Sequence, residues 1–510
     1  MTGHLPIHAL SDAVGGSGRI ATDEARRALA AQDISGQGPE RPGVIARPAT
    51  IGDLQSVVRV AADHQMPIVV RGGGLSYTGG YWALRPDTLM IDMRDLNAVE
   101  PVTAASSVVT VEAGATWAQV YEALKPHGLR LPVFGPLSGS RATVGGGVAQ
   151  NVAFYGSATH GLAGDHVLAM DVVAGNGDLI TVNGPEIAAY VGDAGILGIK
   201  ARIDMRVIAF PSQQHYVSLA FDDERGLLAV QRAIAKGALR GTIAEAYGFD
   251  RVTHHNLAAT GFSVLEAAGI AGDVARGAGS LVSAARSLTK MAVAPRAQLT
   301  RIAWSLHCVL EGDDPALSDA AAQLDELCRS NGGRPIPDTI PRVARAKPFR
   351  PVRAMLGPDG ERWLPMHALF PPDGVDEALT IVAAARTQHR QAMQACDLRM
   401  SCMTAVIGDR IIVEPQFFWP DSLTEFLRAN VLPQQLAAHG EAQSNPRGRE
   451  LAHTLRRDLT QKFGAAGGRF IQLGKFYKTP LSESAQSSRQ AIKPANDPDG
   501  LFNPGALEFN

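Results

Sequence analysis

The 510-residue chain has few cysteines and no long apolar run. Its four cysteines are scattered and none forms a Cys-x-x-Cys pair, so neither a disulfide scaffold nor a structural zinc site is expected. No stretch reaches the roughly eighteen apolar residues of a membrane-spanning helix, and we expect no membrane span. The start of the chain lacks a basic region followed by an apolar run, which predicts a cytoplasmic protein without a secretory signal.

The chain also lacks an excess of charge of either sign. Lys and Arg number 48 and Asp and Glu number 50, so the formal net charge is −2. This balance argues against a nucleic acid or an anionic membrane as the main partner. Hydrophobic residues make up 45% and charged residues 19%, as in a globular protein, and the length predicts more than one domain.

Hydrophobic periodicity predicts alternating helices and strands from about residue 44 onward. Residues 1–40 are expected to be weakly organised apart from one short helix over 22–32. The pattern then predicts helices over 53–64, 117–125, 226–238 and 314–329, and strands over 67–70, 89–93, 108–112, 167–173, 179–182, 302–310 and 411–418. An Asn-Gly pair at 176–177 indicates a hairpin turn. Residues 335–351 are predicted as a surface loop and 447–457 as a solvated helix face.

Glycine is concentrated in three clusters. The first runs from Arg71 to Gly80 and follows a predicted strand; the second runs from Thr143 to Asn151, and the third from Gly192 to Ile199. Consecutive glycines let backbone N–H groups converge on one concavity that binds phosphate oxygens. The first cluster matches neither the P-loop nor a clean Gly-x-Gly-x-x-Gly pattern. A tight surface turn is the alternative for any one cluster, but three in this order indicate a large cofactor.

The clusters and the end of the chain resemble the FAD-dependent oxidoreductases of the vanillyl-alcohol oxidase / p-cresol methylhydroxylase superfamily. Residues 67–80 with the strand at 89–93 resemble its diphosphate loop, and residues 142–151 with 161–168 resemble its central flavin segment. Residues 192–199 resemble the GxxGxLGI element of glycolate-oxidase and D-lactate-dehydrogenase relatives. The sequence DPDGLFNPG at 497–505 resembles the closing motif of the family.

The resemblance implies an α+β fold of two domains. A discontinuous FAD-binding domain of the PCMH type would span 41–210 and be completed by 465–510, after an N-terminal extension over 1–40. A substrate domain (the cap), with an antiparallel sheet and flanking helices, would occupy 211–464. The residues expected to contact FAD are Arg71, Gly72, Gly73, Gly74, Leu75, Ser76, Tyr77, Thr78, Gly79, Pro136, Thr143, Gly145, Gly146, Gly147, Asn151, Gly156, Gly195, Gly198, Ile199 and Asn503.

Three departures from the family bear on how FAD is held. Leu75 stands where many members carry a flavin-linking His, residues 135–139 contain no Cys, and the strand predicted over 411–418 has no His. We therefore expect non-covalent FAD. The chain also lacks the His-rich HxGDxN-like motif of the 2-hydroxyacid relatives, so no metal site is expected.

The resemblance also points to residues that hold the substrate. Tyr477-Lys478-Thr479 resembles the Tyr-Arg-Thr triplet that binds the phenolate in phenol-oxidising members, with Lys in place of Arg. Lys475 is an alternative cation in the same segment. The opposite interpretation is a tyrosine packed at a strand end between solvated lysines.

Other candidates follow from position and residue type. On a strand, Glu414 and Gln416 share one face and would line a substrate cavity, unless that strand is an ordinary sheet edge. His160 flanks the central flavin segment and suits proton transfer near neutral pH, although a structural histidine is the alternative.

These observations predict an FAD-dependent oxidase or dehydrogenase. A hydride would pass from an alcohol or benzylic C–H of a small, aromatic or hydroxylated substrate to flavin N5. The alternatives are a D-2-hydroxyacid dehydrogenase of the lactate or glycolate type and a non-catalytic flavin-binding protein. Dioxygen, a quinone or a cytochrome remain open as the electron acceptor, as does a homodimer.

Overall fold

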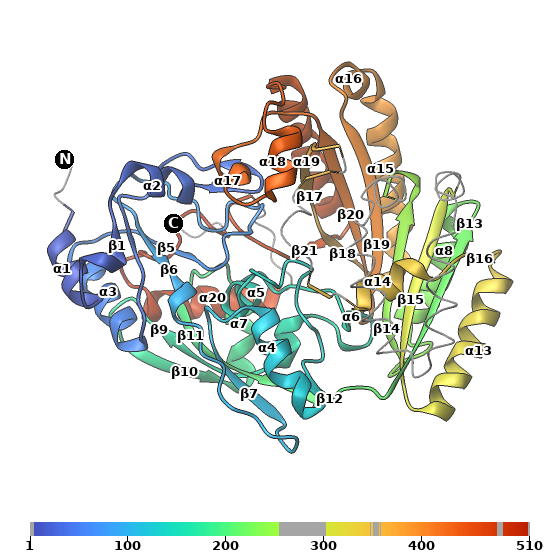
Figure 1. Ribbon diagram of the computed structural model, residues 1–510, viewed down its shortest axis with the longest axis horizontal. Helices are drawn as coiled ribbons and strands as arrows, with labels where there is room; N and C mark the ends of the chain where they lie inside the picture. Colours follow the sequence, from blue (N-terminus) through green and yellow to red (C-terminus); the bar gives the residue numbers. More distant parts are fainter. Residues whose placement is uncertain are drawn as a thin grey trace.

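The computed structural model describes residues 5–253, 302–346, 348–349, 356–357, 359–476 and 483–507. Figure 1 shows one body built from both ends of the chain, in blue, cyan and red, and a second built from its middle, in green to orange. The predicted α+β fold, with a split first domain and a cap that contains an antiparallel sheet, is confirmed. No helix among the described residues is long and apolar enough to cross a bilayer.

The first body contains two small sheets. The first has the strand order β1 (Ile20–Ala21), β4 (Val44–Ala46), β6 (Leu89–Asp92), β5 (Ile68–Arg71), in which β4, β6 and β5 are parallel. The second is antiparallel, with the order β10 (Leu179–Asn183), β9 (Val167–Val173), β11 (Ile199–Arg206), β7 (Val108–Glu112). The strands predicted over 108–112 and 167–173 are confirmed with these bounds.

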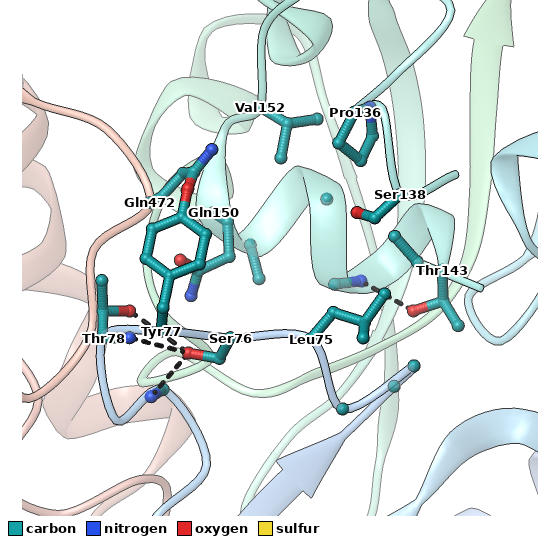
Figure 2. A pocket seen from close by; sticks show the side chains of 18 of the residues that line it. Leu75, Ser76, Tyr77, Thr78, Pro136, Ser138, Thr143, Gln150, Val152 and Gln472 are labelled. Atoms are coloured by element: carbon teal, nitrogen blue, oxygen red, sulfur yellow. Dashed lines mark hydrogen bonds between the residues drawn. The ribbon is translucent and has the colours of Figure 1, made fainter. Parts of the chain in front are cut away.

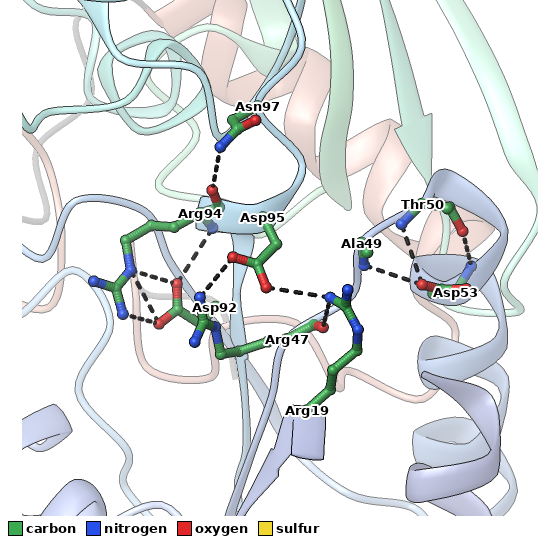
Figure 3. A network of polar contacts seen from close by, with 9 residues as sticks. All are labelled: Arg19, Arg47, Ala49, Thr50, Asp53, Asp92, Arg94, Asp95 and Asn97. Atoms are coloured by element: carbon green, nitrogen blue, oxygen red, sulfur yellow. Dashed lines mark hydrogen bonds and ion pairs between the residues drawn. The ribbon is translucent and has the colours of Figure 1, made fainter. Parts of the chain in front are cut away.

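Short helices surround these sheets. Helix α3 (Ile51–Asp63) begins with a capping box between Thr50 and Asp53 and buries an apolar stripe spaced three and four residues apart. In a separate group of contacts just after β6, Arg19 and Arg47 both pair with Asp95 (Figure 3). The remaining helices of this body are α1 (Ile7–Ala13), α2 (Glu24–Ala30), α4 (Trp117–Leu124), α5 (Val144–Gln150), α6 (Ser157–His160), α7 (Ile187–Tyr190) and α20 (Glu483–Asn496).

The N-terminal segment is more ordered than its sequence predicts. Residues 5–40 contain α1, α2 and the strand pair β2 (Gln32–Asp33) and β3 (Gly36–Gln37), and β1 joins the parallel sheet. The prediction of a weakly organised extension is therefore wrong. Elements of two to seven residues are too short to show a repeating hydrophobic pattern. They are stabilised mainly by contacts with residues distant in sequence, which a local pattern does not record.

The cap is built on one antiparallel sheet of nine described strands. Its order is β16 (Arg334–Pro335), β13 (Gln213–Phe221), β15 (Trp304–Gly312), β14 (Ile243–Asp250), β19 (Arg399–Ile407), β20 (Arg410–Trp419), β18 (Ala368–Phe370), β21 (Arg469–Phe470), with β17 (Arg362–Pro365) also paired to β20. Because β21 lies at 469–470, strand pairing extends the cap beyond 464, and the domain bounds remain a prediction. A separate small pair joins β8 (Leu129–Arg130) and β12 (Ile208–Ala209).

Helices pack against this sheet, and two of them differ from what the sequence predicts for residues 335–351 and 447–457. The packed helices are α8 (Glu224–Ala235), α13 (Asp314–Ser330), α14 (Thr339–Ala346), α15 (Val375–Gln388) and α19 (Pro446–Ala465), and the shorter α16 (Arg390–Ala395), α17 (Glu425–Arg428) and α18 (Pro433–His439) lie nearby in Figure 1. Helix α14 occupies part of the predicted surface loop and buries Arg345. Arg456 on α19 is fully buried rather than solvated, and its guanidinium donates to the carbonyl of Tyr77.

Candidate functional site

One cleft, which we call the glycine cleft, brings together all three glycine clusters and the cap sheet. Its first wall is formed by Gly72, Gly73, Gly74, Leu75, Ser76, Tyr77, Thr78, Gly80, Pro136, Ser138, Thr143, Gly145, Gly146, Gly147, Gln150, Val152, Ala194, Gly195, Gly198, Ile199 and neighbouring apolar residues. The cap contributes Trp363, His367, Met403, Glu414 and Gln416. Figure 2 shows Leu75 and Tyr77 on the first cluster, and the N–H of Gln472 donates to the carbonyl of Gln150 at 2.8 Å on the same cleft.

The first glycine cluster packs directly on the second. A Cβ at Gly72 would lie 2.2 Å from Oγ1 of Thr143, and a Cβ at Gly73 would lie 2.2 Å from the carbonyl oxygen of Arg141. The backbone N–H groups of Gly72, Gly73, Gly74 and Leu75 donate to no protein acceptor within the described chain. Consecutive unpaired N–H groups at the wall of a cleft fit an anionic group such as the diphosphate of FAD.

Polar groups behind the first cluster hold its shape. The hydroxyl of Tyr81 donates to the carbonyl oxygens of Gln32 and Gly74, at 2.8 and 2.9 Å. The carboxylate of Asp33 accepts from the N–H of Gly79 at 3.0 Å, and burial raises the pKa of Asp33 to about 6. The N-terminal segment therefore shapes the loop that faces the cleft.

The second cluster forms the start of α5. Thr143 caps this helix and accepts from the N–H of Gly146 at 3.3 Å (Figure 2). A Cβ at Gly145 would meet Ala113, and one at Gly147 would meet the indole of Trp117, which lies 2.6 Å away. These two glycines therefore serve internal packing, whereas a Cβ at Gly146 would meet only Thr143, at 3.1 Å.

The cap wall carries a chain of polar side chains. The hydroxyl of Tyr77 lies 3.0 Å from Nδ1 of His367. Nε2 of His367 lies 3.2 Å from a carboxylate oxygen of Glu414, and the amide of Gln416 donates to the other oxygen at 2.6 Å. The strand pattern that predicted a shared face for Glu414 and Gln416 thus brings both to the cleft. Their catalytic role stays a prediction.

Most predicted cofactor residues line the cleft, and five lie behind its wall. Arg71 is buried 3.6 Å from Asp92, and Gly79 binds Asp33. The other three support the backbone: Asn151 ends α5 and accepts from Gly164, Gly156 lies against Pro132, and Asn503 donates to Gly80 and Ala194. These contacts support the backbone around the cleft, and a role of the five residues in holding FAD stays a prediction.

Of the predicted catalytic residues outside the cap wall, the two that the structure describes, His160 and Lys475, lie away from the glycine cleft. His160 lines a different pocket, beside Asp165, and burial lowers the pKa of His160 to about 4. Lys475 donates to Oδ1 of Asn503 and does not line the glycine cleft, and burial lowers its pKa to about 7. Tyr477, Lys478 and Thr479 lie outside the described residues.

The sequence analysis missed several residues of the cleft. They include the buried polar residues His367 and Lys200, together with Trp363, Phe154, Met403, Gln150 and Gln472. Trp363, Pro365 and His367 alternate along the chain, a spacing that places residues on one face of a strand. A single histidine with no partner nearby in sequence gives no further signal.

Comparisons with known proteins agree with this site. Residues 42–183 match the family model described as "FAD binding domain". The chain is 28% identical over 251 residues to D-2-hydroxyglutarate dehydrogenase of Xanthomonas citri pv. viticola, a region that covers 47% of this chain and 52% of that protein. It is 24% identical over 207 residues to a glycolate oxidase subunit of Bacillus subtilis, over 39% of this chain and 44% of that protein. The matched region thus spans about half the length of these relatives.

Solved structures resemble the whole chain. The structure of p-cresol methylhydroxylase with substrate bound superposes with a TM-score of 0.72 at 15% identity, and the match covers 99% of this chain and 96% of that one. At this identity the likeness establishes the fold. Residues 42–183 therefore match an FAD-binding domain, and the chain as a whole has the fold of p-cresol methylhydroxylase, with the three glycine clusters on one cleft.

Proposed function

We propose that the protein is an FAD-dependent oxidase or dehydrogenase that acts on an alcohol or benzylic C–H of a small substrate in the glycine cleft. The main support for this proposal is that the glycine clusters and the cap sheet form two walls of the same cleft. One wall offers unpaired backbone N–H groups at Gly72, Gly73 and Gly74, and the other offers the ionisable side chains His367 and Glu414. FAD would lie along the first wall, which leaves the second for the substrate.

Several observations support an aromatic or hydroxylated substrate. The rings of Trp363 and Phe154 and the side chain of Met403 give the cap end an apolar surface, next to the polar chain from Tyr77 to Gln416. Apolar walls with a few fixed polar groups are typical of sites for small organic molecules. A D-2-hydroxyacid dehydrogenase is the second candidate, favoured by the similarity to the D-2-hydroxyglutarate dehydrogenase and the glycolate oxidase subunit.

We also propose that FAD is held without a covalent bond. Leu75 stands in the first glycine cluster, and His367 is the only histidine among the described residues that line the cleft, which include no cysteine. Denaturation in acid should therefore release all the flavin into the filtrate. Flavin that stays with the precipitated polypeptide would contradict this proposal.

The function is tested by anaerobic bleaching of the bound flavin. The FAD-loaded protein is mixed with benzylic alcohols, phenols with a benzylic carbon, D-2-hydroxy acids and sugars, and absorbance near 450 nm is followed. Bleaching by the first two classes supports the proposal, and bleaching by hydroxy acids alone supports the second candidate. A flavin that no compound bleaches would indicate a binding protein. Peroxide formed on admitting air would identify an oxidase.

A further inference from the structure

His367 lies at a break between two strands, directly opposite Glu414. Strands β17 and β18 both pair with β20, with Pro365 opposite Gln416 and Ala368 opposite Val413. The register is continuous across the break, where the N–H of Met366 still donates to the carbonyl of Pro415 at 3.0 Å. This register places His367 and Glu414 as cross-strand neighbours on the face that lines the glycine cleft.

The contacts of His367 fix its orientation. Its ring stacks on Tyr77, with centroids 5.6 Å apart and 29° between the planes, and meets the edge of Phe154 at 6.3 Å. Oε2 of Glu414 lies 3.2 Å from Nε2 and has no hydrogen-bond partner among the described residues, so a proton on Nε2 would face a carboxylate that can accept its hydrogen bond. Nδ1 is then left as the acceptor for the hydroxyl of Tyr77. Both rings are therefore held in one arrangement across the two walls.

We infer that Tyr77 and His367 together accept the hydroxyl proton of an alcohol substrate, with Glu414 as a positioning residue. The inference rests on the proposed function. FAD held along the first wall would supply the two-electron oxidant, because the carbon loses its two electrons as a hydride. The substrate hydroxyl gives its proton to the Tyr77 oxygen while Tyr77 passes its own proton to Nδ1 of His367. The carbon–oxygen bond becomes a carbonyl, and Glu414 neutralises the imidazolium.

The other described polar groups of the cleft are less suited to this task. The amides of Gln150, Gln416 and Gln472 line the cleft but do not accept protons near neutral pH. Lys200 is buried and donates to Asp193 at 2.6 Å. The hydroxyl of Tyr81 is committed to backbone carbonyl oxygens. Among the described residues of the cleft, His367 has a nitrogen lone pair that can accept a proton, the carboxylate of Glu414 beside it, and a contact with the hydroxyl of Tyr77 on the first wall.

The test compares His367→Gln, Tyr77→Phe and Glu414→Gln with the wild type, with His64→Asn as control because His64 is exposed on α3's C-terminal end. Anaerobic flavin reduction by an alcohol that bleaches the wild type is followed across pH. We expect His367→Gln and Tyr77→Phe to slow reduction by about 10²- to 10⁴-fold at unchanged FAD content. His367→Gln should also lose the fall in rate at low pH.

The variant Glu414→Gln tests whether Glu414 acts on His367 through its charge or only through packing. Without the carboxylate the imidazolium is less stable, so the fall in rate should move to lower pH while the maximal rate drops about 10- to 100-fold. A merely structural role would lower FAD content or stability and leave the pH profile in place. In ¹⁵N-histidine spectra of FAD-loaded wild type without substrate, the neutral ring of His367 should carry its proton on Nε2.

The outcomes distinguish this inference from the proposed function. Failure of every alcohol to bleach the wild type would overturn both. Bleaching of the wild type with unchanged rates in folded, FAD-loaded His367→Gln or Tyr77→Phe would overturn only the role of this pair. A neutral His367 protonated on Nδ1 would also overturn it, because that nitrogen could not take the proton.

Discussion

Asn503 donates from Nδ2 to the carbonyl oxygen of Gly80 at 2.9 Å, across 423 residues of sequence. The same amide donates to the carbonyl of Ala194, and its Oδ1 accepts from Lys475. One side chain from the closing motif therefore ties the first glycine cluster to the third. Its backbone is left-handed, with φ of 43°, a conformation that Asn tolerates better than most residues.

Replacement of Asn503 should weaken FAD binding. Asn503→Asp keeps the size and the left-handed preference but removes the donor, so a carboxylate would face two carbonyl oxygens. We expect the dissociation constant for FAD to rise about tenfold or more, as for the loss of a buried hydrogen bond. Flavin fluorescence titration of the apoprotein measures this. Asn97→Asp, on an exposed loop, is the control, and an equal change in both variants would contradict the prediction.

Gly73 should tolerate no side chain. In Gly73→Ala the new methyl would lie 2.2 Å from the carbonyl oxygen of Arg141, which is backbone and cannot move alone. The first and second clusters would separate, so we expect FAD content after purification to fall severalfold. Gly464→Ala is the matched control, because its Cβ would meet nothing within 4 Å in α19, and helical Ala is favoured by about 1 kcal/mol. Normal FAD content in Gly73→Ala would refute this account.

Local hydrophobic patterns predict individual strands of the fold, but they do not predict how distant strands pair. The strands at Val108–Glu112 and Val167–Val173 were predicted with their observed bounds, because alternation and length identify them without distant contacts. The order of the cap sheet was not predictable in this way. Strand β14 pairs with β19 across about 150 residues, and no local pattern records such a pairing.

The candidate site was predictable where it consists of backbone. Runs of glycine indicate a loop whose backbone a ligand or another chain segment can approach closely. The three glycine clusters do line one cleft. The roles of side chains depend on tertiary packing instead. Arg456 reads as one more charge on a charged helix, yet it is buried against Tyr77 and lies 4.1 Å from the Phe476 ring centroid. His367 meets Glu414 within the cap sheet, and it gains Tyr77 and Phe154 only when the cap meets the first domain.

Glu245 should make stability depend on pH. It is 2% exposed, neither of its carboxyl oxygens has a hydrogen-bond partner among the described residues, and burial raises its pKa to about 8 against the pull of Arg345. The folded state then keeps a proton that the unfolded state releases, so stability falls as pH rises from about 4.5 to 8. Arg130, which also lowers this pKa, and Glu311, which raises it, share the site.

Glu245→Gln should remove this loss. The amide has nearly the same shape and no charge, so we expect thermal unfolding a few degrees higher than in the wild type at pH 8 to 9 and nearly equal at pH 5. Unfolding temperatures recorded across this range test the prediction. A difference that stays constant with pH would show that Glu245 acts by packing rather than by its charge.

The cap should depend on one buried ion pair for its attachment. Arg130 on β8 of the first body donates to Glu311 on β15 of the cap at 2.5 Å, and both side chains are about 5% exposed. Breaking a buried pair leaves a charge without its partner, so Arg130→Met should cost about 3–5 kcal/mol of unfolding free energy in urea titration. Arg334→Met is the control, because Arg334 pairs with Asp222 in solvent and should change little.

A double-mutant cycle isolates that contribution. In Arg130→Met/Glu311→Gln both charges are gone, so the loss should be smaller than the sum of the two single losses. Arg345 also pairs with Glu311, and removal of the carboxylate leaves that guanidinium buried beside Glu245, which limits the recovery. Strict additivity would show that Arg130 supports the interface through its methylene groups and its contact with Phe134 instead. The orientation of the cap over the glycine cleft would then rest on apolar packing.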